Sequence, residues 1–268
     1  MKDSSVSWCA AMKIEALFSD FDGTLCQLDA RREEARMSPR LKRFLNKLSR
    51  KIPFGIITTK DLSFIRERVP FAHGIAAVSG LEMQVGERRL VDERIAANLD
   101  AIENAYHKAF SGLKEIHDAR IGIERKTTEE DELIGFCIDW RMSHDWTQAR
   151  TRVMPLIEQC RQAGLYVAES KMSPFANVYF KKVDKGTAFA RLKAELGVTG
   201  PVMYLGDSED DNPAFELSEV SIGIKHQKNV PDLKCKYLLE FLKLEGFIAI
   251  LTDENLEFRE DMPGINTK

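Results

Sequence analysis

The sequence contains no apolar run that approaches the ~20 residues needed to cross a bilayer. It has five cysteines, but no two form a Cys-x-x-Cys pair and no histidine spacing typical of zinc accompanies them. The first residues lack the uninterrupted apolar segment of a secretory signal. A net charge of only −3 does not indicate nucleic acid or an acidic membrane surface as a partner. These absences favour a cytoplasmic protein with idle, reduced thiols.

Both flanks of the chain show the alternation of strands and helices that is typical of a parallel sheet. Short apolar runs predict buried strands at residues 14–19, 54–57, 75–78, 202–205 and 220–224. Ser38, as the N-cap, and Pro39, as the first helical residue, predict the start of one helix, and residues 186–196 predict another. We therefore expect an α/β fold with a Rossmann-like parallel-sheet core. Near the C-terminus, residues 237–251 predict a helix and residues 254–268 a polar tail.

The middle of the chain follows a different pattern, in which pairs of strands surround two long helices. The helices are predicted at 95–113 and 146–163, and the strands at 83–85, 89–91, 120–125, 133–140, 166–169 and 177–181. This pattern predicts an inserted α+β module. The expected domains are a discontinuous core of residues 12–84 and 181–253, an inserted domain of residues 85–180, and terminal extensions at 1–11 and 254–268.

Two carboxylates follow the first predicted strand directly, in the segment Asp20-Phe21-Asp22-Gly23-Thr24. Ligands of an open parallel sheet collect at the carboxyl ends of its strands, and Gly23 allows a sharp backbone turn there. One carboxylate can attack phosphorus and form an aspartyl-phosphate. A second can protonate the leaving alkoxide and then accept a proton from water. Asp20 and Asp22 are the candidates for these two functions, and a solvated Asp-Gly turn is the alternative.

Two further polar sites lie at predicted strand or helix ends. The hydroxyl of Thr58 can donate a hydrogen bond to a phosphoryl oxygen, unless it only caps a helix. Lys60, which follows Thr59, would add positive charge or be solvated. Lys185 opens a predicted helix, where its ammonium can stabilise a nucleophile and phosphoryl oxygens, unless it is a surface lysine.

An acidic turn at residues 206–212 follows the strand predicted at 202–205. Its Asp207 and Asp211 offer the oxygen ligands that Mg²⁺ prefers, although an acidic helix cap is the alternative. Gathering these residues with Asp20 and Asp22 would cost about 4 kcal/mol for each like-charge pair at roughly 4 Å and an effective dielectric of about 20. Because a divalent cation removes most of that cost, the sequence predicts a Mg²⁺ site formed by these four residues.

The four motifs, in this order, resemble those of the haloacid dehalogenase superfamily of phosphotransferases. Asp20-x-Asp22-Gly23-Thr24 looks like its first motif, Thr58 its second, Lys185 its third and Gly206-Asp207-x-x-x-Asp211 its fourth. The resemblance implies that Asp20 is the nucleophile and Asp22 the acid–base residue. It also implies Mg²⁺ bound by Asp20, the Asp22 carbonyl and Asp207, with Asp211 supporting the metal directly or through a neighbour.

The inserted module lies between the second and third motifs and is similar to a C2-type cap, subtype B, which in that superfamily closes over sugar phosphates. The segments that most resemble trehalose-6-phosphate phosphatases are Gly80-Leu81-Glu82, Lys126 with Trp140-Arg141, and Val183-Asp184-Lys185-Gly186. Departures from that group are Ser79 for a common His, Thr59-Lys60 for Gly-Arg, Ser208 for a second Asp, and Asn177 for a cap Glu. Thr58-Thr59-Lys60 is nearer to the Ser-Ser-Lys of mannosyl-3-phosphoglycerate phosphatases.

The resemblance therefore implies a Mg²⁺-dependent phosphatase of a sugar phosphate, with trehalose 6-phosphate as the best single guess. The expected substrate contacts are Gly23, Thr24, Thr59, Lys60, Lys126, Arg141 and Asn177. Other sugar phosphates, such as mannosyl-3-phosphoglycerate or sucrose phosphate, a phosphosugar mutase, and a non-catalytic sugar-phosphate sensor are the alternatives. We expect a monomer or a weak homodimer.

Overall fold

The computed structural model describes residues 11–28, 30–169, 174–226 and 232–268, which form two compact units. The first unit comprises the described residues up to Ile57 together with Arg66–Ile75 and Lys185–Lys268, and the second comprises Thr58–Ile65 and Ala76–Asp184. The domain boundaries predicted at 84/85 and 180/181 stay predictions. Cys9 and all but one residue of the predicted extension 1–11 lie outside the described residues.

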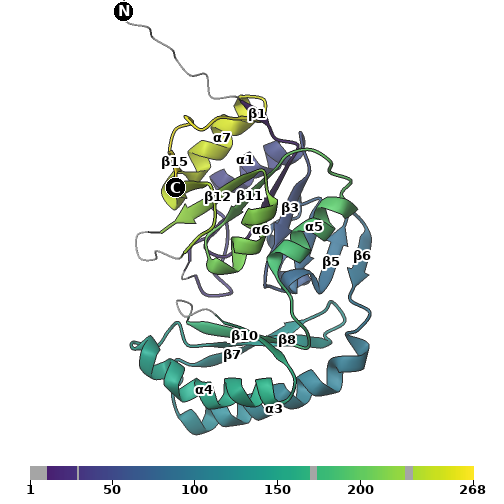
Figure 1. Cartoon of the computed structure of the whole chain (residues 1–268), viewed down its shortest axis with the longest axis vertical. Helices are drawn as coiled ribbons and strands as arrows, with labels where there is room; N and C mark the ends of the chain where they lie inside the picture. The colour runs from purple at the N-terminus through teal and green to yellow at the C-terminus, as the bar shows by residue number, and fades with distance from the viewer. Residues whose placement is uncertain (1–10, 29, 170–173, 227–231) are drawn as a thin grey trace, which may run out of the picture. The chain divides into compact units, whose positions relative to one another are not determined.

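A mainly parallel sheet forms the centre of the first unit, with the strand order β15-β13-β12-β11-β2-β3-β4 (Figure 1). Its strands are β2 (Ala16–Ser19), β3 (Phe54–Ile57), β4 (Gly74–Ala77), β11 (Val202–Gly206), β12 (Val220–Lys225), β13 (Tyr237–Glu240) and β15 (Ile265–Thr267). The neighbours from β13 to β3 pair in parallel, and β15 pairs antiparallel with β13. The predicted Rossmann-like core is confirmed. The chain passes into the second unit within β4.

The helices of the first unit pack in pairs, α1 with α7 and α5 with α6. Their bounds are α1 (Pro39–Ser49), α5 (Lys185–Glu195), α6 (Asn212–Leu217) and α7 (Leu244–Asp253), with short 3₁₀ helices η3 (Glu209–Asp211) and η4 (Phe241–Lys243). The predicted start of α1 is confirmed, because the Ser38 hydroxyl accepts a hydrogen bond from the Leu41 N–H at 3.0 Å and Pro39 is the first helical residue. Helix α2 (Leu62–Arg68) contains a junction between the units.

The second unit is an α+β structure, as predicted. Four antiparallel strands have the order β7-β8-β10-β9: β7 (Gly122–Thr127), β8 (Leu133–Asp139), β10 (Phe175–Tyr179) and β9 (Tyr166–Glu169). Helices α3 (Leu99–Ile116) and α4 (Trp146–Gln162) cover one face of this sheet (Figure 1). The unit also contains a hairpin of β5 (Glu82–Val85) and β6 (Arg88–Val91), and short 3₁₀ helices η1 (Val78–Gly80) and η2 (Ala96–Asn98).

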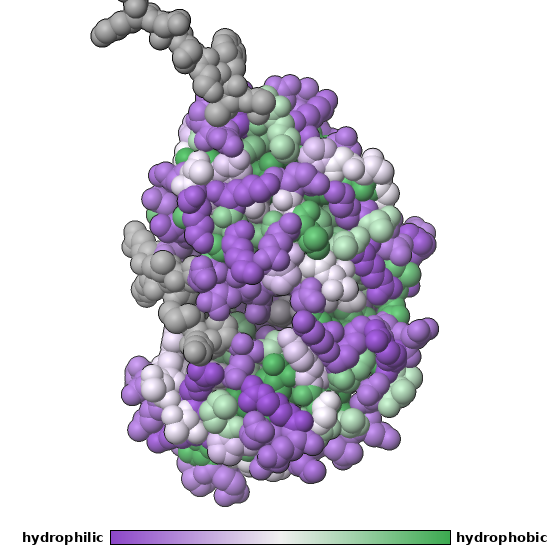
Figure 2. Space-filling view, viewed as in Figure 1, coloured by the Kyte–Doolittle hydropathy of each residue, from purple (hydrophilic) through white to green (hydrophobic). Residues whose placement is uncertain are grey.

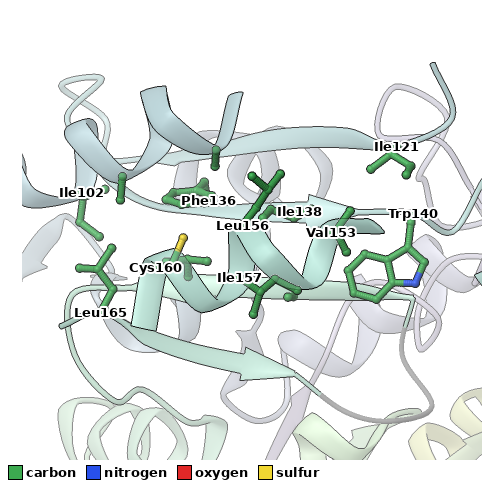
Figure 3. Packing of buried hydrophobic residues seen from close by; sticks show 14 of the residues in the cluster. Ile102, Ile121, Phe136, Ile138, Trp140, Val153, Leu156, Ile157, Cys160 and Leu165 are labelled. Carbon is green, nitrogen blue, oxygen red and sulfur yellow. The ribbon is translucent and has the colours of Figure 1, made fainter. Parts of the chain in front are cut away.

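An apolar core fills the space between this sheet and its two helices (Figure 3). Phe136 and Ile138 of β8 point toward Val153 and Ile157 of α4, and Trp140 closes one end of the cluster. All five side chains are almost completely buried. Because alternate residues of a strand face opposite sides, the residues between them in β8, such as Cys137, lie on the face away from the helices.

Two predictions for the C-terminal region are wrong. The segment predicted as one helix at 237–251 begins with strand β13, and helix α7 starts only at Leu244. The predicted polar tail at 254–268 contains two strands: β14 (Glu257–Phe258) pairs with β1 (Met12–Lys13), and β15 pairs with β13. Both strands are short and hold few apolar residues, so their sequence alone gives no strong period-two signal.

The packing of the four described cysteines is consistent with the prediction of idle, reduced thiols. Cys26, Cys137, Cys160 and Cys235 are buried free thiols. None of the helices in the described part of the chain is long and apolar enough to cross a membrane. On the face of the molecule drawn in Figure 2, apolar residues are interspersed among polar and charged ones.

Candidate active site

The first and fourth motifs meet at the carboxyl ends of two adjacent strands. Asp20 follows β2 and Asp207 follows β11, and these strands pair in parallel with Ser19 opposite Leu205. The Asp20 N–H donates to the Leu205 carbonyl at 2.9 Å, which fixes the backbone on both sides of the junction. Asp20, Asp207 and Asp211 are buried, and each offers a carboxylate oxygen within 4.8 Å of the others. Thus three of the four predicted metal ligands lie together.

Lys185 is the cation of this cluster. Its Nζ lies 2.8 Å from Asp20 Oδ2 and 2.7 Å from Asp211 Oδ1, and only 4% of its side chain is exposed. Lys185 is the first residue of α5, and the close approach of α5 to α6 requires Gly186: a Cβ there would lie 2.8 Å from both the Cβ and the carbonyl oxygen of Pro213. The alternative that Lys185 is a surface lysine is therefore wrong.

Asp211 organises the acidic turn. Its Oδ2 accepts hydrogen bonds from the N–H groups of Asp207 and Ser208, both at 3.0 Å, and from the Ser208 hydroxyl at 3.1 Å. Its Oδ1 accepts from Lys185 and from the Tyr204 hydroxyl, both at 2.7 Å. Because a carboxylate has about four lone-pair positions, these five donors occupy its acceptor capacity. Asp211 therefore suits the support of neighbouring ligands better than direct contact with a metal.

The turn after Asp20 is shaped by Gly23 and Thr24. Gly23 has a φ of +71°, and a Cβ there would lie 2.1 Å from Asp207 Oδ2, so any larger residue would collide with that carboxylate. The Thr24 hydroxyl donates to Asp207 Oδ1 at 3.1 Å. Asp22 is half-buried on the same turn, with the Cys26 thiol 3.9 Å from its Oδ1. Gly23 and Thr24 thus shape the carboxylate cluster, and their predicted contact with substrate stays a prediction.

Burial gives this cluster unusual electrostatics. Burial raises the pKa of Asp20 to about 7, although Lys185 opposes the shift. Burial and the charge of Asp20 hold the pKa of Asp207 well above its ordinary value. Burial alone would lower the pKa of Lys185, but the carboxylates of Asp20 and Asp211 raise it, so the ammonium stays charged. Three carboxylates around one ammonium form a set of oxygen donors with excess negative charge, which fits Mg²⁺.

We expect this charge to make the metal-free protein sensitive to pH. The folded-state pKa of Asp20, about 7, exceeds the ordinary 3.8, so the folded state binds the proton more tightly and its stability falls as pH rises between these values. Asp20→Asn removes this titration. In EDTA, the melting temperature of Asp20→Asn relative to wild type should therefore increase from about pH 5 to about pH 8. A difference that is constant over this range would contradict a raised pKa at Asp20.

The second motif begins the second unit. Thr58 follows β3 directly and is fully buried; its N–H donates to the Ala76 carbonyl at 3.0 Å, and its hydroxyl accepts from the Lys60 N–H at 3.2 Å. Lys60 is not solvated, because its Nζ lies 3.2 Å from Glu124 Oε1 of β7 and its side chain is only 9% exposed. The contact of Thr58 with a phosphoryl group stays a prediction.

Lys126 of β7 also reaches this segment, since its Nζ donates to the Thr59 carbonyl at 2.8 Å and the residue is 2% exposed. The alternative that Lys126 is a surface charge is therefore wrong.

The remaining predicted substrate contacts lie on β10 and after β8. Asn177 is buried at the centre of β10, opposite Cys137 of β8. The Arg141 guanidinium lies 2.7 Å from Asp139 Oδ2 and 5.5 Å from the centre of the Phe175 ring. Each has a role in the packing or ion pairing of the second unit, and contact with substrate stays a prediction for both.

Known protein folds agree with this architecture. No family model matches the chain, and no curated relative does. Among solved structures, the C-terminal domain of a C. albicans trehalose-6-phosphate phosphatase has a TM-score of 0.72 and 16% identity, with coverage of 90% of this chain and 92% of that one. A structure described as a trehalose-6-phosphate phosphatase related protein has a TM-score of 0.68 and 16% identity, with coverage of 90% and 98%. The chain shares the fold of these proteins.

The similarity extends to a haloacid dehalogenase-like hydrolase from Bacteroides thetaiotaomicron, with a TM-score of 0.59, 14% identity, and coverage of 90% of this chain and 99% of that one. The chain spans almost the whole length of each of these structures. The predicted resemblance to the haloacid dehalogenase superfamily is thereby confirmed at the level of the fold.

Two residues that contact the predicted site residues were not predicted from the sequence: Tyr204, which donates to Asp211, and Glu124, which pairs with Lys60. Tyr204 stands inside the apolar run of β11, where an aromatic residue is expected to be core, so its contact with Asp211 gave no separate signal. Glu124 had a weak signal, because it lies two residues before Lys126 in a strand and the two therefore share a face.

Proposed function

We propose that this chain is a Mg²⁺-dependent phosphatase of the haloacid dehalogenase superfamily that hydrolyses a sugar phosphate monoester. The observation that carries the proposal is the buried cluster in which Lys185 lies 2.8 Å from Asp20, with Asp207 beside them. Groups whose pKa values are shifted by burial and by neighbouring charges cluster at functional sites, and the raised pKa values of Asp20 and Asp207 support this proposal. A metal site next to a nucleophile explains why this charge is concentrated at the strand ends.

Asp20 is the proposed nucleophile. One of its carboxylate oxygens attacks phosphorus, a bond forms from that oxygen to phosphorus, and the ester bond from phosphorus to the sugar oxygen breaks. Asp22, two residues later on the same turn, donates a proton to the departing alkoxide. Lys185 stays on the other oxygen of Asp20 and stabilises negative charge through both steps.

Hydrolysis of the aspartyl-phosphate completes the cycle. Asp22, now ionised, accepts a proton from water as that water attacks phosphorus, and the bond from phosphorus to Asp20 breaks. Inorganic phosphate leaves, and both carboxyl groups return to their starting states. Asp20, the Asp22 carbonyl and Asp207 would hold Mg²⁺, which supplies positive charge to the phosphoryl oxygens and lets Asp20 ionise at neutral pH.

The second unit is the proposed cap and selects the sugar. Its sheet carries polar residues on the face away from α3 and α4, among them Lys126 and Asn177. Trehalose 6-phosphate is the best single candidate for the substrate, and the fold that the chain shares with proteins described as trehalose-6-phosphate phosphatases supports this choice. A cytoplasmic location, and a monomer or weak homodimer that binds no nucleic acid or membrane, stay predictions from the sequence.

Phosphate release from a panel of monoesters tests this function. The panel contains trehalose 6-phosphate, mannosyl-3-phosphoglycerate, sucrose 6-phosphate, glucose 6-phosphate and an aryl phosphate, each with Mg²⁺ and with EDTA. We expect release that requires Mg²⁺ and is dominated by one sugar phosphate. Release that EDTA leaves unchanged would contradict the metal site. Transfer of the phosphoryl group between hydroxyls, without free phosphate, would indicate a mutase, and binding without turnover a sensor.

A further inference from the structure

A tyrosine that the proposed reaction does not use lies beneath the cluster. Tyr204 is in β11, three residues before Asp207, and its side chain is fully buried. Its hydroxyl donates a hydrogen bond to Asp211 Oδ1 at 2.7 Å. Burial and the nearby carboxylate charge raise its pKa well above the ordinary value, so the hydroxyl keeps its proton and acts as a donor.

The ring of Tyr204 is held in one orientation. Phe189 packs edge-on against it with a centroid distance of 6.0 Å and an interplanar angle of 79°, and Phe215 does so at 5.5 Å and 75°. A phenylalanine ring would make the same contacts and fill the same space. Packing therefore accounts for the aromatic ring, and the hydroxyl needs a different explanation.

A continuous set of hydrogen bonds leads from this hydroxyl to the proposed nucleophile. Asp211 Oδ1 accepts from Tyr204 and from Lys185, and the same Lys185 ammonium lies 2.8 Å from Asp20 Oδ2. The other oxygen of Asp211 accepts from the N–H of Asp207. The orientation of one carboxylate thus determines where both the ammonium and the acidic turn lie.

We propose that Tyr204 is a positioning residue for the phosphoryl-transfer reaction, acting through Asp211 to keep Lys185 on Asp20. This inference rests on the proposed function. Without the hydroxyl, Asp211 Oδ1 loses a neutral donor at a carboxylate that is fully buried. Among the described residues, Lys185 is then the remaining side-chain donor to that oxygen, and it moves toward Asp211 and away from Asp20. Small displacements of this kind slow the reaction without weakening substrate binding.

The test is Tyr204→Phe, with Tyr237→Phe as the matched control. Tyr237 is in β13 of the same sheet, and its hydroxyl also donates to a carboxylate, that of Glu260, but outside the cluster. With the sugar phosphate that the wild type hydrolyses best, Tyr204→Phe should lower kcat by about 10- to 100-fold. Its KM should change by less than about twofold, because the binding of substrate in the ground state is unaffected. Tyr237→Phe should keep the wild-type kcat.

A double-mutant cycle separates positioning from a general packing defect. If Tyr204 acts through Asp211, its replacement should lower kcat little further in an Asp211→Asn background, so the two effects are not additive. A wild-type kcat for Tyr204→Phe, or fully additive effects, would overturn the inference and leave the phosphatase function standing. A wild-type protein that releases no phosphate with Mg²⁺ would instead overturn the proposed function, and the inference with it.

Discussion

Replacing Asp20 with asparagine should lower Mg²⁺-dependent phosphate release by more than about 10⁴-fold while the fold stays intact. The amide has nearly the shape of the carboxylate but no anionic oxygen to attack phosphorus. The fold should survive, because Asp20 is buried with its pKa raised to about 7, and a neutral side chain removes a buried charge that burial disfavours. Phosphate release, circular dichroism and thermal melting of the purified variant together measure this.

The matched control is Asp253→Asn, the same chemical change at a carboxylate that is 67% exposed and pairs with Lys47 away from the cluster. That variant should keep wild-type activity. Trapping of phosphoenzyme adds a direct measurement, since the wild type should become labelled by a phosphorylated substrate and Asp20→Asn should not. Substantial activity in a folded Asp20→Asn protein would refute Asp20 as the nucleophile.

Elements of the core were predicted well where a single local pattern, such as a helix cap or a short apolar run, marked them. Ser38 and Pro39 mark the start of α1, and the run at 54–57 corresponds to the fully buried strand β3. The C-terminal region was predicted less well because two periods follow each other without a break. Tyr237 and Leu239 are buried at a spacing of two, typical of a strand, whereas Leu244 begins a helical spacing.

The candidate site divides in a similar way. The acidic residues after strand ends could be predicted, because the carboxyl ends of neighbouring parallel strands must meet, and Asp20 and Asp207 do lie together in the structure. The separate role of each carboxylate, as a metal ligand or as a hydrogen-bond acceptor that holds its neighbours, could not be predicted. Only the hydrogen bonds show that the oxygens of Asp211 are taken up by Lys185, Tyr204 and the acidic turn. Such partners are set by packing over the whole unit, which no short motif records.

Replacing Lys185 with methionine should remove activity and also destabilise the metal-free protein. Methionine fills a similar volume but leaves the buried carboxylates of Asp20 and Asp211 without the ammonium that now lies within 2.8 Å of both. Loss of one partner of a buried ion pair costs about 3–5 kcal/mol in unfolding free energy. The loss of charge stabilisation should reduce kcat by at least about 10²-fold. Phosphate release and urea unfolding in EDTA, at about pH 8, measure the two effects.

The control for this variant is Lys234→Met, which breaks the exposed pair between Lys234 and Glu216 and should change stability and activity little. Two conditions should reduce the difference in unfolding free energy between Lys185→Met and the wild type. Protonation of Asp20 at about pH 5 removes part of the uncompensated charge, and Mg²⁺ supplies another cation to the same oxygens. If neither condition reduces this difference in unfolding free energy, the loss of stability arises from packing around the methionine. The electrostatic account of this cluster, on which the proposed metal site depends, would then be wrong.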